Sequence, residues 1–510
     1  MNLDSLVGRL MMIGVPGTQC DNSTREILAQ IRPGTVILFS KNIRSPEQVR
    51  NLTSEIRRFL GYDVLFAIDQ EGGIVSRLRD GFSVSPGAMA TAATGNADNA
   101  RTTGKILGME MRAVGIDLNL APVVDINSNP SNPGIGVRSY GDNPERVAEY
   151  SQAFVEGLRD SGCLSCLKHF PGKGRVNVDA HIDLPTLSAT AEELDSWELS
   201  PFKQIESDCL MSSHVYVPAL QSERGPCTVS REVLTGLLRE KLGYKGLVFS
   251  DDMGMGGLTK YVGPAEGAVK ALKAGNNVLI YCHDPEVQIL VKNTLLEAVQ
   301  SDRELLSCIV GSNRRFDELV GKSSMVDRPP LEVVGNKENL SIMREIAEAS
   351  ITVMSKDNPA IPLDVDEITD VLAVRLSRRV MVEDGELDAV PSIARRVAEA
   401  AKREIIGFES SISAEDAAKL AGSVSGEGLA VIFTENAHLN EGQSHLVQSI
   451  CRKTRRSLVV ALRNPYDAFI EGVENAVLSF GYEHVSQSAL EKVLFGFIEA
   501  RGKLPVARVI

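Results

Sequence analysis

The segment from Cys166 to Leu187 gathers polar side chains that can bind or exchange protons: Lys168, His169, Asp179 and His181. The Gly and Pro residues between them indicate an irregular loop rather than a buried helix or strand. A carboxylate two residues before a histidine can orient the imidazole ring, which then gains and loses protons near neutral pH. The pair Asp179 and His181 therefore indicates acid–base chemistry.

A second reactive group follows the apolar run Leu247–Ser250, where the sequence places Asp251 and Asp252. Only one member of this pair need point into a site at the end of the strand, because neighbouring side chains on a strand face opposite ways. An aspartate at such a position, facing a loop that carries a histidine, suits covalent catalysis at a sugar carbon. We therefore expect Asp251 to work together with the loop of His181.

Other polar side chains also come at or just after the ends of apolar runs. They are Asp69, Asp125, Lys168 with His169, His214 and His283. Arg77 lies eight residues beyond Asp69, and Arg138 lies near the end of a loop rich in Gly and Pro, 132–140. A carboxylate at a strand end accepts hydrogen bonds from ligand hydroxyls, and an arginine offers a fork of donors. A converging set of this kind favours a ligand site over isolated structural histidines.

The elements that must position these residues are eight short apolar runs separated by helix-like segments. The runs are Leu10–Val15, Thr35–Phe39, Val64–Ile68, Asp117–Ala121, Leu164–Leu167, Cys209–Ser213, Leu247–Ser250 and Val278–Tyr281, and the main helical segments are 46–60, 96–113, 144–161, 191–206, 230–242 and 263–274. Such alternation predicts an α/β fold of the (β/α)8 TIM barrel type, in which active sites gather at the C-terminal ends of the strands. An open, doubly wound sheet is the alternative.

Beyond the barrel the composition changes, which predicts a second unit. We expect the catalytic barrel at 1–321, a linker at 322–343 that contains two adjacent prolines, and a smaller α/β (αβα) sandwich at 344–510 with a mostly parallel sheet. Its strand-like runs are Ile351–Met354, Val371–Leu376, Ile405–Phe408, Leu429–Thr434, Leu458–Leu462 and Ala476–Phe480, with helices expected at 391–403 and 489–500. This unit either packs on the barrel or forms the surface of a homodimer. Its histidines, His438, His445 and His484, are expected at the surface.

Bulk composition narrows the classes of partner. A chain of 510 residues is too long for one ordinary core, and its net charge of −13 argues against nucleic acid or an anionic membrane as partner. No apolar stretch reaches the length of a membrane span, and the N-terminal residues do not resemble a secretion signal. We therefore expect a cytoplasmic protein with reduced cysteines that binds a small neutral or locally charged ligand.

Several other chemistries lack their motifs. The sequence contains no GxxxxGK[ST] phosphate loop and no HExxH zinc motif. His169, Asp179, His181 and His214 leave a metal hydrolase as an alternative, but their spacing is not that of ligands on one rigid element. We expect neither a metal nor an organic cofactor.

Several motifs together resemble glycoside hydrolase family 3, and within it the bacterial β-N-acetylglucosaminidases of the NagZ type, in a two-domain form. The most specific are KHFPGKGRVNVDAH and FSDDMGM; AIDQEGGIVSRL, IGVRSYG and MSSHVYVPAL are similar to further family segments. The closing segment SFGYEHVSQSALEKVLFGFIEARGKLPV resembles the end of the second domain of longer members. One departure stands out, because this chain has Lys173 where the family pattern has histidine.

The resemblance implies a role for each matching residue. Asp251 corresponds to the nucleophile, His181 to the acid/base and Asp179 to the residue that orients it. Sugar contacts are implied for Asp69, Arg77, Arg138, Lys168 and His169, with His214 as a further residue of the pocket. The implied reaction is a two-step hydrolysis that retains the anomeric configuration.

The implied activity is an exo-acting β-N-acetylglucosaminidase that acts on muropeptides in peptidoglycan recycling, or on chitin-derived oligosaccharides. Three alternatives stay open: a phosphorylase of the same family, which Lys173 would not oppose, a β-glucosidase, and a glycan-binding protein without activity. The Ser-Asp-Asp at 250–252 separates the chain from the β-glucosidases, which usually have Ser-Asp-Trp there and lack the Asp-x-His loop. Intact Asp179, His181 and Asp251 argue against a protein that only binds glycan.

Overall fold

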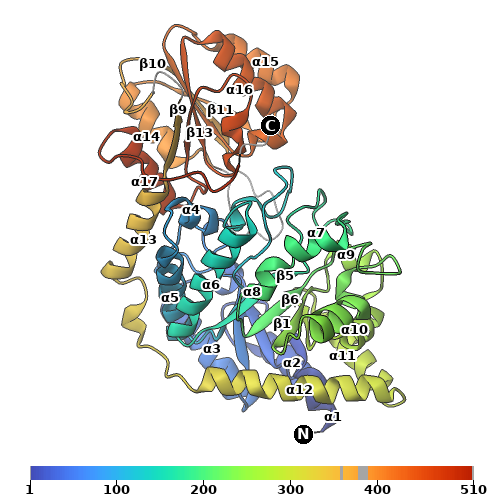
Figure 1. Cartoon of the computed structure of the whole chain (residues 1–510). Helices are drawn as coiled ribbons and strands as arrows, with labels where there is room; N and C mark the ends of the chain where they lie inside the picture. Colours follow the sequence, from blue (N-terminus) through green and yellow to red (C-terminus); the bar gives the residue numbers. More distant parts are fainter. Residues whose placement is uncertain (1, 356–359, 377–388, 508–510) are drawn as a thin grey trace.

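The computed structural model of the chain describes residues 2–355, 360–376 and 389–507. It contains a closed eight-stranded barrel and a separate six-stranded sheet, which stand one above the other in Figure 1. Parts of the expected C-terminal unit, 356–359, 377–388 and 508–510, lie outside the described residues. The (β/α)8 fold and the second α/β unit that the sequence predicts are both confirmed.

The eight barrel strands pair in parallel in chain order, and β1 closes on β8. Their bounds are β1 Met11–Gly14, β2 Thr35–Leu38, β3 Leu65–Ile68, β4 Leu118–Asn119, β5 Leu164–Phe170, β6 Cys209–Ser212, β7 Leu247–Asp252 and β8 Val278–Tyr281. Nearly all strand residues are buried because the barrel interior covers one face and the helices cover the other. This is why the strands are continuous apolar runs in the sequence.

Helices surround the barrel in the connections between its strands. Their bounds are α1 Leu3–Gly8, α2 Asn22–Ile31, α3 Pro46–Leu60, α4 Ala88–Ala93, α5 Asp98–Ala113, α6 Pro144–Asp160, α7 Ala191–Ser196, α8 Ser200–Gln204, the π-helix η4 Glu232–Lys241, α9 Gly256–Thr259, α10 Pro264–Ala274, α11 Pro285–Ala298 and α12 Arg303–Ser324, with short 3-10 turns η1 Ser40–Asn42, η2 Gly136–Arg138 and η3 Cys227–Val229. Helix α12 crosses the bottom of the barrel (Figure 1), where Phe316 and Leu319 join the apolar cluster of its interior.

The helix caps expected from sequence are present. The side chain of Ser45 accepts a hydrogen bond from the Gln48 amide at the start of α3, and that of Asn143 caps α6 in the same way. In contrast, the single helix expected over 191–206 is wrong. Helix α7 ends at Ser196 and α8 begins at Ser200, because Pro201 lacks an amide hydrogen and is favoured in the first turn of a new helix.

The second sheet is mixed. Its order is β11-β10-β12-β13-β14-β9, with β9 antiparallel to β14 and the other pairs parallel. The strands are β9 Thr352–Ser355, β10 Ile368–Arg375, β11 Ile405–Glu409, β12 Leu429–Thr434, β13 Arg456–Ala461 and β14 Asn475–Leu478; the helices are α13 Lys337–Ser350, α14 Ser392–Ala401, α15 Ala414–Ser423, α16 Glu441–Lys453 and α17 His484–Leu494, with 3-10 turns η5 Leu331–Val333, η6 Ala437–Leu439 and η7 Pro465–Phe469. The helix expected at 489–500 is therefore shifted, since α17 begins at His484 and ends before Gly496, whose φ is +72°.

The second unit packs directly on the barrel. Ile74, Val75, Met89 and Val137, which belong to barrel loops and to α4, lie in the same buried apolar cluster as the strands of the second sheet. Helix α13 joins the two units and contacts both α4 and α17. The division into 1–321, 322–343 and 344–510 remains our proposal, and the proposed linker holds the end of α12, η5 and the start of α13.

Among the described residues, none of the helices combines the length and the apolar character that crossing a membrane requires.

Candidate active site

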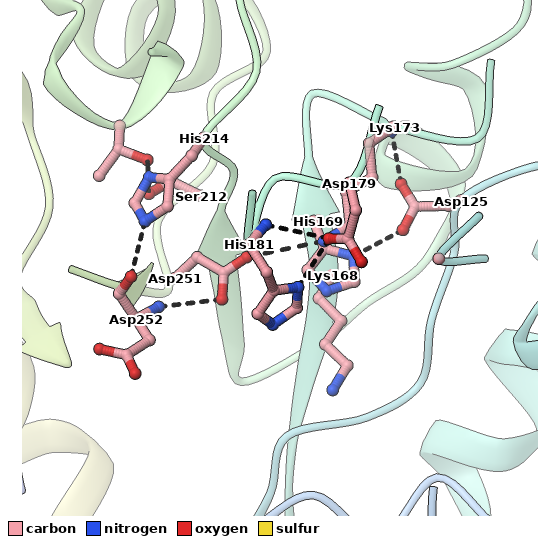
Figure 2. A network of polar contacts seen from close by, with 12 residues as sticks. Asp125, Lys168, His169, Lys173, Asp179, His181, Ser212, His214, Asp251 and Asp252 are labelled. Carbon is pink, nitrogen blue, oxygen red and sulfur yellow. Dashed lines mark hydrogen bonds and ion pairs between the residues drawn. The ribbon is translucent and has the colours of Figure 1, made fainter. Parts of the chain in front are cut away.

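A cavity of about 620 Å³ opens at the C-terminal ends of the barrel strands. Its wall includes Asp69, Arg77, His181, Asp251, Asp252 and His283 together with apolar side chains from strand ends. Figure 2 shows how His181 and Asp251 lie near one another from different segments. The fold thus brings the reactive groups of four different loops to one edge, as the barrel prediction requires.

Asp251 lies near the end of β7 and presents one oxygen without a hydrogen bond. Its Oδ1 accepts a hydrogen bond from the Asp252 amide at 2.9 Å, whereas its Oδ2 is buried and has no hydrogen-bond partner within the described part of the chain. Burial tends to raise the pKa of Asp251, but the nearby ammonium of Lys173, together with smaller contributions from other neighbours such as the Asp252 amide, outweighs this effect, so the pKa lies below its usual value. The carboxylate therefore stays ionised, with an oxygen that need not break a hydrogen bond before it attacks.

Lys173 supplies this charge from the loop that follows β5. Its Nζ lies 3.7 Å from Asp251 Oδ2, and its backbone amide donates a hydrogen bond of 2.7 Å to Asp125 Oδ1. Lys173 also lines a small hollow beside the main cavity, where Arg138 and His181 are its neighbours. The residue that departs from the family pattern is therefore in contact with the candidate nucleophile.

His181 and Asp179 form a hydrogen-bonded pair on the loop after β5. Asp179 Oδ1 lies 2.7 Å from His181 Nδ1 and also accepts the His181 amide at 3.0 Å. Burial raises the pKa of Asp179, but the hydrogen bond and charge of His181 outweigh it and lower the pKa to about 2. An ionised Asp179 keeps the hydrogen on Nδ1, which leaves Nε2 to exchange a proton with a ligand in the cavity.

The loop that carries this pair is fixed to the segment that follows Asp251. The amides of Gly256 and Gly257 donate to the carbonyl oxygens of His181 and Ala180 at 3.1 and 2.8 Å. A Cβ atom at Gly256 would lie 2.5 Å from the carbonyl oxygen of Ile182, so only glycine allows this approach. The start of α9 therefore holds the acid/base candidate beside the nucleophile candidate.

Lys168 and Arg138 belong to a buried network of charges. Lys168 Nζ lies 2.7 Å from Asp69 Oδ1 and 2.6 Å from Glu71 Oε1. Arg138 binds both oxygens of Glu71, through Nε and Nη2 at 2.8 Å each. Burial alone raises the pKa of Glu71, but the two cations overcome it and lower the pKa to about 2. The same carboxylates keep the pKa of Lys168 and of Arg138 above their usual values despite burial.

Arg77 and Asp69 complete this side of the cavity. Arg77 Nη2 lies 3.9 Å from Asp69 Oδ2, and its backbone amide donates to Gln70 Oε1 at 2.8 Å. The guanidinium also lies over the ring of Phe39, 5.9 Å from the centroid. A carboxylate flanked by two cations is a suitable acceptor for sugar hydroxyls, because the cations fix its position.

His169 and Asp125 form a second pair, which is more deeply buried than Asp179 and His181. His169 Nδ1 lies 2.6 Å from Asp125 Oδ2, and both side chains are almost fully buried. Burial lowers the pKa of His169 well below its usual value, with further lowering by Lys173 and Arg138, and burial raises that of Asp125 to about 6. His169 is therefore neutral, and Asp125 orients both its ring and the Lys173 amide.

His214 lies behind the nucleophile rather than on the cavity wall, in contrast to the expectation that it belongs to the pocket. It is fully buried; its Nε2 lies 2.9 Å from the carbonyl oxygen of Asp252, and its Nδ1 lies 2.8 Å from Thr228 Oγ1. A carbonyl oxygen only accepts, so the hydrogen is on Nε2 and the Thr228 hydroxyl donates to Nδ1. Burial lowers the pKa of His214, and this neutral ring holds the end of β7 in place.

One group of side chains among the described residues has the composition of a metal site. Asp252, Cys282 and His283 each bring a ligand atom within 4.8 Å of the others. Burial raises the pKa of the Cys282 thiol well above its usual value, so the sulfur is a protonated thiol in this structure. That the reaction needs no metal ion remains a prediction.

Two contributors to the site were not expected from the sequence. Glu71 links Lys168 and Arg138, and Thr228 orients His214. Asp125 was expected at a strand end, but its role in orienting His169 was not. Glu71 lies in the motif of Asp69, but its partners are distant in sequence. His438 also differs from expectation: it is half-buried, and its ring contacts Asp467 and the carbonyl oxygen of Pro130.

Residues 2–315 match the family model described as the glycosyl hydrolase family 3 N-terminal domain. The β-hexosaminidase of Alkalilimnicola ehrlichii is 37% identical over 290 residues, which span 55% of this chain and 82% of that protein. The β-hexosaminidase of Methylococcus capsulatus is 36% identical over 326 residues, which span 63% of this chain and 94% of that protein.

A solved structure is similar over both units. It is a glycoside hydrolase family 3 β-N-acetylglucosaminidase from Paenibacillus sp., with a TM-score of 0.88, 32% identity and 99% coverage of each chain. The arrangement of barrel and second sheet is therefore shared with a relative of the same overall length, and the resemblance seen in the motifs extends to the whole fold.

Proposed function

We propose that this chain, which belongs to glycosyl hydrolase family 3 and is a β-hexosaminidase, releases terminal N-acetylglucosamine from oligosaccharides through a covalent intermediate on Asp251. The observation that carries this proposal is the position of Asp251, whose Oδ2 has no hydrogen-bond partner among the described residues, beside the hydrogen-bonded pair Asp179 and His181. The relatives named as β-hexosaminidases and the Paenibacillus β-N-acetylglucosaminidase support the choice of sugar. Muropeptides and chitin-derived oligosaccharides in the cytoplasm are the proposed substrates.

In the first step, Asp251 Oδ2 attacks the anomeric carbon and forms a bond to it. The bond between that carbon and the leaving oxygen breaks at the same time, and His181 Nε2 gives its proton to this oxygen. Asp179 stays ionised and stabilises the imidazolium that donates. The charge of Lys173 keeps Asp251 ionised at the start of the step.

In the second step, neutral His181 takes a proton from water, whose oxygen attacks the same carbon and displaces Asp251. Two displacements at one carbon give net retention of configuration. A histidine suits this role because it is neutral when it acts as base, so it does not repel an electron-rich acceptor.

The buried network supplies the sugar site in this proposal. Asp69 accepts hydrogen bonds from hydroxyls, and Lys168 and Arg77 fix its position. Lys168, Arg77 and Arg138 donate to the sugar oxygens. His169 contributes its Nε2, since its Nδ1 is turned to Asp125. These contacts hold the anomeric carbon near Asp251, and such positioning is a large part of catalysis.

Phosphate instead of water as the acceptor is the second candidate, and Lys173 is the observation that favours it. Its ammonium lies 3.7 Å from Asp251 and lines a hollow that it shares with Arg138 and His181. Three groups that are or become cationic line this hollow beside the single carboxylate of Asp179, and their excess positive charge would attract an anion. The product would then be sugar 1-phosphate.

The test is turnover of the p-nitrophenyl β-glycoside of N-acetylglucosamine with and without phosphate, with identification of the sugar product. Free N-acetylglucosamine at a rate that phosphate does not change supports the hydrolase, and sugar 1-phosphate as main product supports the second candidate. A preference for the glucoside would indicate a β-glucosidase, and inhibition by chelators a metal hydrolase.

The variant Asp251→Asn is the matched control in this assay, because it removes the nucleophilic charge with almost no change of size. We expect it to abolish turnover of every substrate, with a loss of at least about 1,000-fold. Turnover that persists in Asp251→Asn would exclude Asp251 as nucleophile, and a wild type that binds N-acetylglucosamine without any turnover would leave the glycan-binding alternative.

A further inference from the structure

The turn η2, Gly136–Arg138, lies where the barrel meets the second unit. Val137, in the middle of this turn, belongs to the buried apolar cluster that includes the strands of the second sheet. Arg138 points the other way and binds both oxygens of Glu71 in the candidate sugar site. One short turn therefore contacts the second unit with one residue and the sugar site with the next.

Asn464, which follows β13 of the second unit, holds this turn. Its Oδ1 accepts a hydrogen bond from the Val137 amide at 3.0 Å, and the side chain is buried. Gly136 has a φ of +47°, and a Cβ atom there would lie 2.3 Å from Asn464 Oδ1. The backbone of the turn thus lies directly against the Asn464 amide group, at a distance that only glycine allows.

Asn464 is itself fixed within the second unit. Its backbone amide donates to Asn436 Oδ1 at 3.2 Å, and Asn436 has the left-handed φ of +51°. The next residues of that loop reach the barrel as well, since His438 Nε2 lies 3.2 Å from the carbonyl oxygen of Pro130. The backbone of Asn464 is therefore held by the second unit, and its side chain extends from there to the barrel.

Two further contacts join the second unit to barrel loops on both sides of the sugar site. The hydroxyl of Tyr466 accepts from Asn127 Nδ2 at 3.0 Å, at the start of the loop that contains η2. On the loop of Arg77, Arg79 forms an ion pair with Glu483 of the second unit. The second unit thus forms side-chain contacts with the two barrel loops that carry Arg77 and Arg138.

We propose that the second unit positions the sugar site, and that Asn464 is the positioning residue for Arg138. Asn464 holds the turn η2, the turn places the Arg138 guanidinium on Glu71, and Glu71 in turn holds Lys168 against Asp69. This inference rests on the proposed sugar-binding role of Arg138 and Lys168. Asn464 acts on substrate affinity through Arg138, and it does not take part in bond breaking.

The test compares Asn464→Ala with wild type on p-nitrophenyl N-acetyl-β-glucosaminide. Loss of the acceptor leaves the Val137 amide buried without a partner, which a shift of the turn relieves. We expect KM to rise about tenfold, because the loss of binding free energy is about that of one hydrogen bond to a buried group. We expect kcat to change less than about twofold. The inhibition constant of free N-acetylglucosamine should rise by the same factor.

Two matched variants separate positioning from general destabilisation. Asn475→Ala is the control, because Asn475 is a buried asparagine of the same unit that accepts from Ser355 Oγ at 2.8 Å at the start of β14, away from the barrel loops. It should leave KM unchanged. Asn464→Asp keeps an acceptor oxygen for the Val137 amide and should restore most of the affinity.

Several outcomes would overturn the inference. These are an unchanged KM in folded Asn464→Ala, an equal rise of KM in Asn475→Ala, or a fall of kcat without a change of KM. If Asn464→Ala does not fold, Gly136→Ala tests the same contact from the barrel side, where its Cβ displaces the turn from Asn464. An inactive wild type would refute the proposed function instead, so the two failures are distinguishable.

Discussion

The balance of charge at one carboxylate decides how the site works. Asp251 is desolvated at the end of β7, which by itself would favour its protonated form. Lys173, at 3.7 Å, makes the largest of the contributions that together reverse that preference and lower the pKa. The residue that departs from the family pattern therefore has a specific electrostatic consequence for the nucleophile.

This balance predicts a change in pH dependence. Removal of the ammonium in Lys173→Met should raise the pKa of Asp251, because burial then acts without its largest opposing charge. The acid limb of kcat/KM against pH should move to higher pH, since Asp251 must be ionised to attack. An isosteric control is Lys203→Met, a lysine whose exposed ion pair is with Asp195. An acid limb that does not move would remove Lys173 from this role.

The second prediction at this scale concerns His181. In His181→Ala, kcat/KM on chitobiose should fall about 100- to 10,000-fold, because its sugar leaving group needs a proton. The p-nitrophenyl glycoside leaves as a stable anion, so its kcat/KM should change far less. Equal losses on both substrates would show that His181 is not the acid.

At the scale of elements, the short helix α9 joins the two catalytic segments. Its first residues follow Asp251 along the chain, and its amides bind the carbonyl oxygens of Ala180 and His181. In the sequence, FSDDMGM and KHFPGKGRVNVDAH are separate motifs. Gly256 and Gly257, directly after the first motif, let its backbone touch the backbone at the end of the second.

This contact makes Gly256 a testable residue. The Cβ of Gly256→Ala would lie 2.5 Å from the Ile182 carbonyl oxygen, so the loop of His181 must shift. A displacement of about 1 Å at a catalytic group costs on the order of 100-fold in kcat. The loss should be larger for chitobiose than for the p-nitrophenyl glycoside, as in His181→Ala. Gly263→Ala is the control, since its Cβ would meet no atom within 4 Å.

On the scale of the whole molecule, the barrel and the second unit contribute side chains to one buried apolar cluster. Ile74, Val75, Met89 and Val137 of the barrel portion are buried in the cluster of the second sheet. Separation of the units would expose these side chains to water, at a cost of roughly 25 cal/mol for each Å² of apolar surface. The two units should therefore unfold together.

Calorimetry checks this prediction. We expect a single thermal transition, and saturating N-acetylglucosamine should shift the whole of it, by about 2.7 kcal/mol at a concentration 100 times the dissociation constant. Loss of barrel and second-sheet structure should coincide when followed by two probes. A separate transition whose midpoint temperature does not change with the ligand would show that the two units unfold independently.

The sequence alone was sufficient for the barrel and for the position of its eight strands, although β5 continues to Phe170 and so includes Lys168 and His169, which were expected in a loop. Apolar runs such as Thr35–Leu38 alternate with capped helices, and this local pattern does not depend on distant contacts. The rule that barrel sites lie at strand ends then brought Asp69, His181 and Asp251 into one site. Asp-x-His is a local motif, so its hydrogen bond was also predictable.

Only the tertiary structure decided which of these residues face the ligand and what holds them. The burial of His214, the bond from Glu71 to Arg138 and the contact of Asn464 with Val137 join residues far apart in the chain. The orientation of a side chain and its partner depends on how loops from different elements pack. Sequence periodicity does not predict such packing, because it indicates only which side of its own helix or strand a residue occupies.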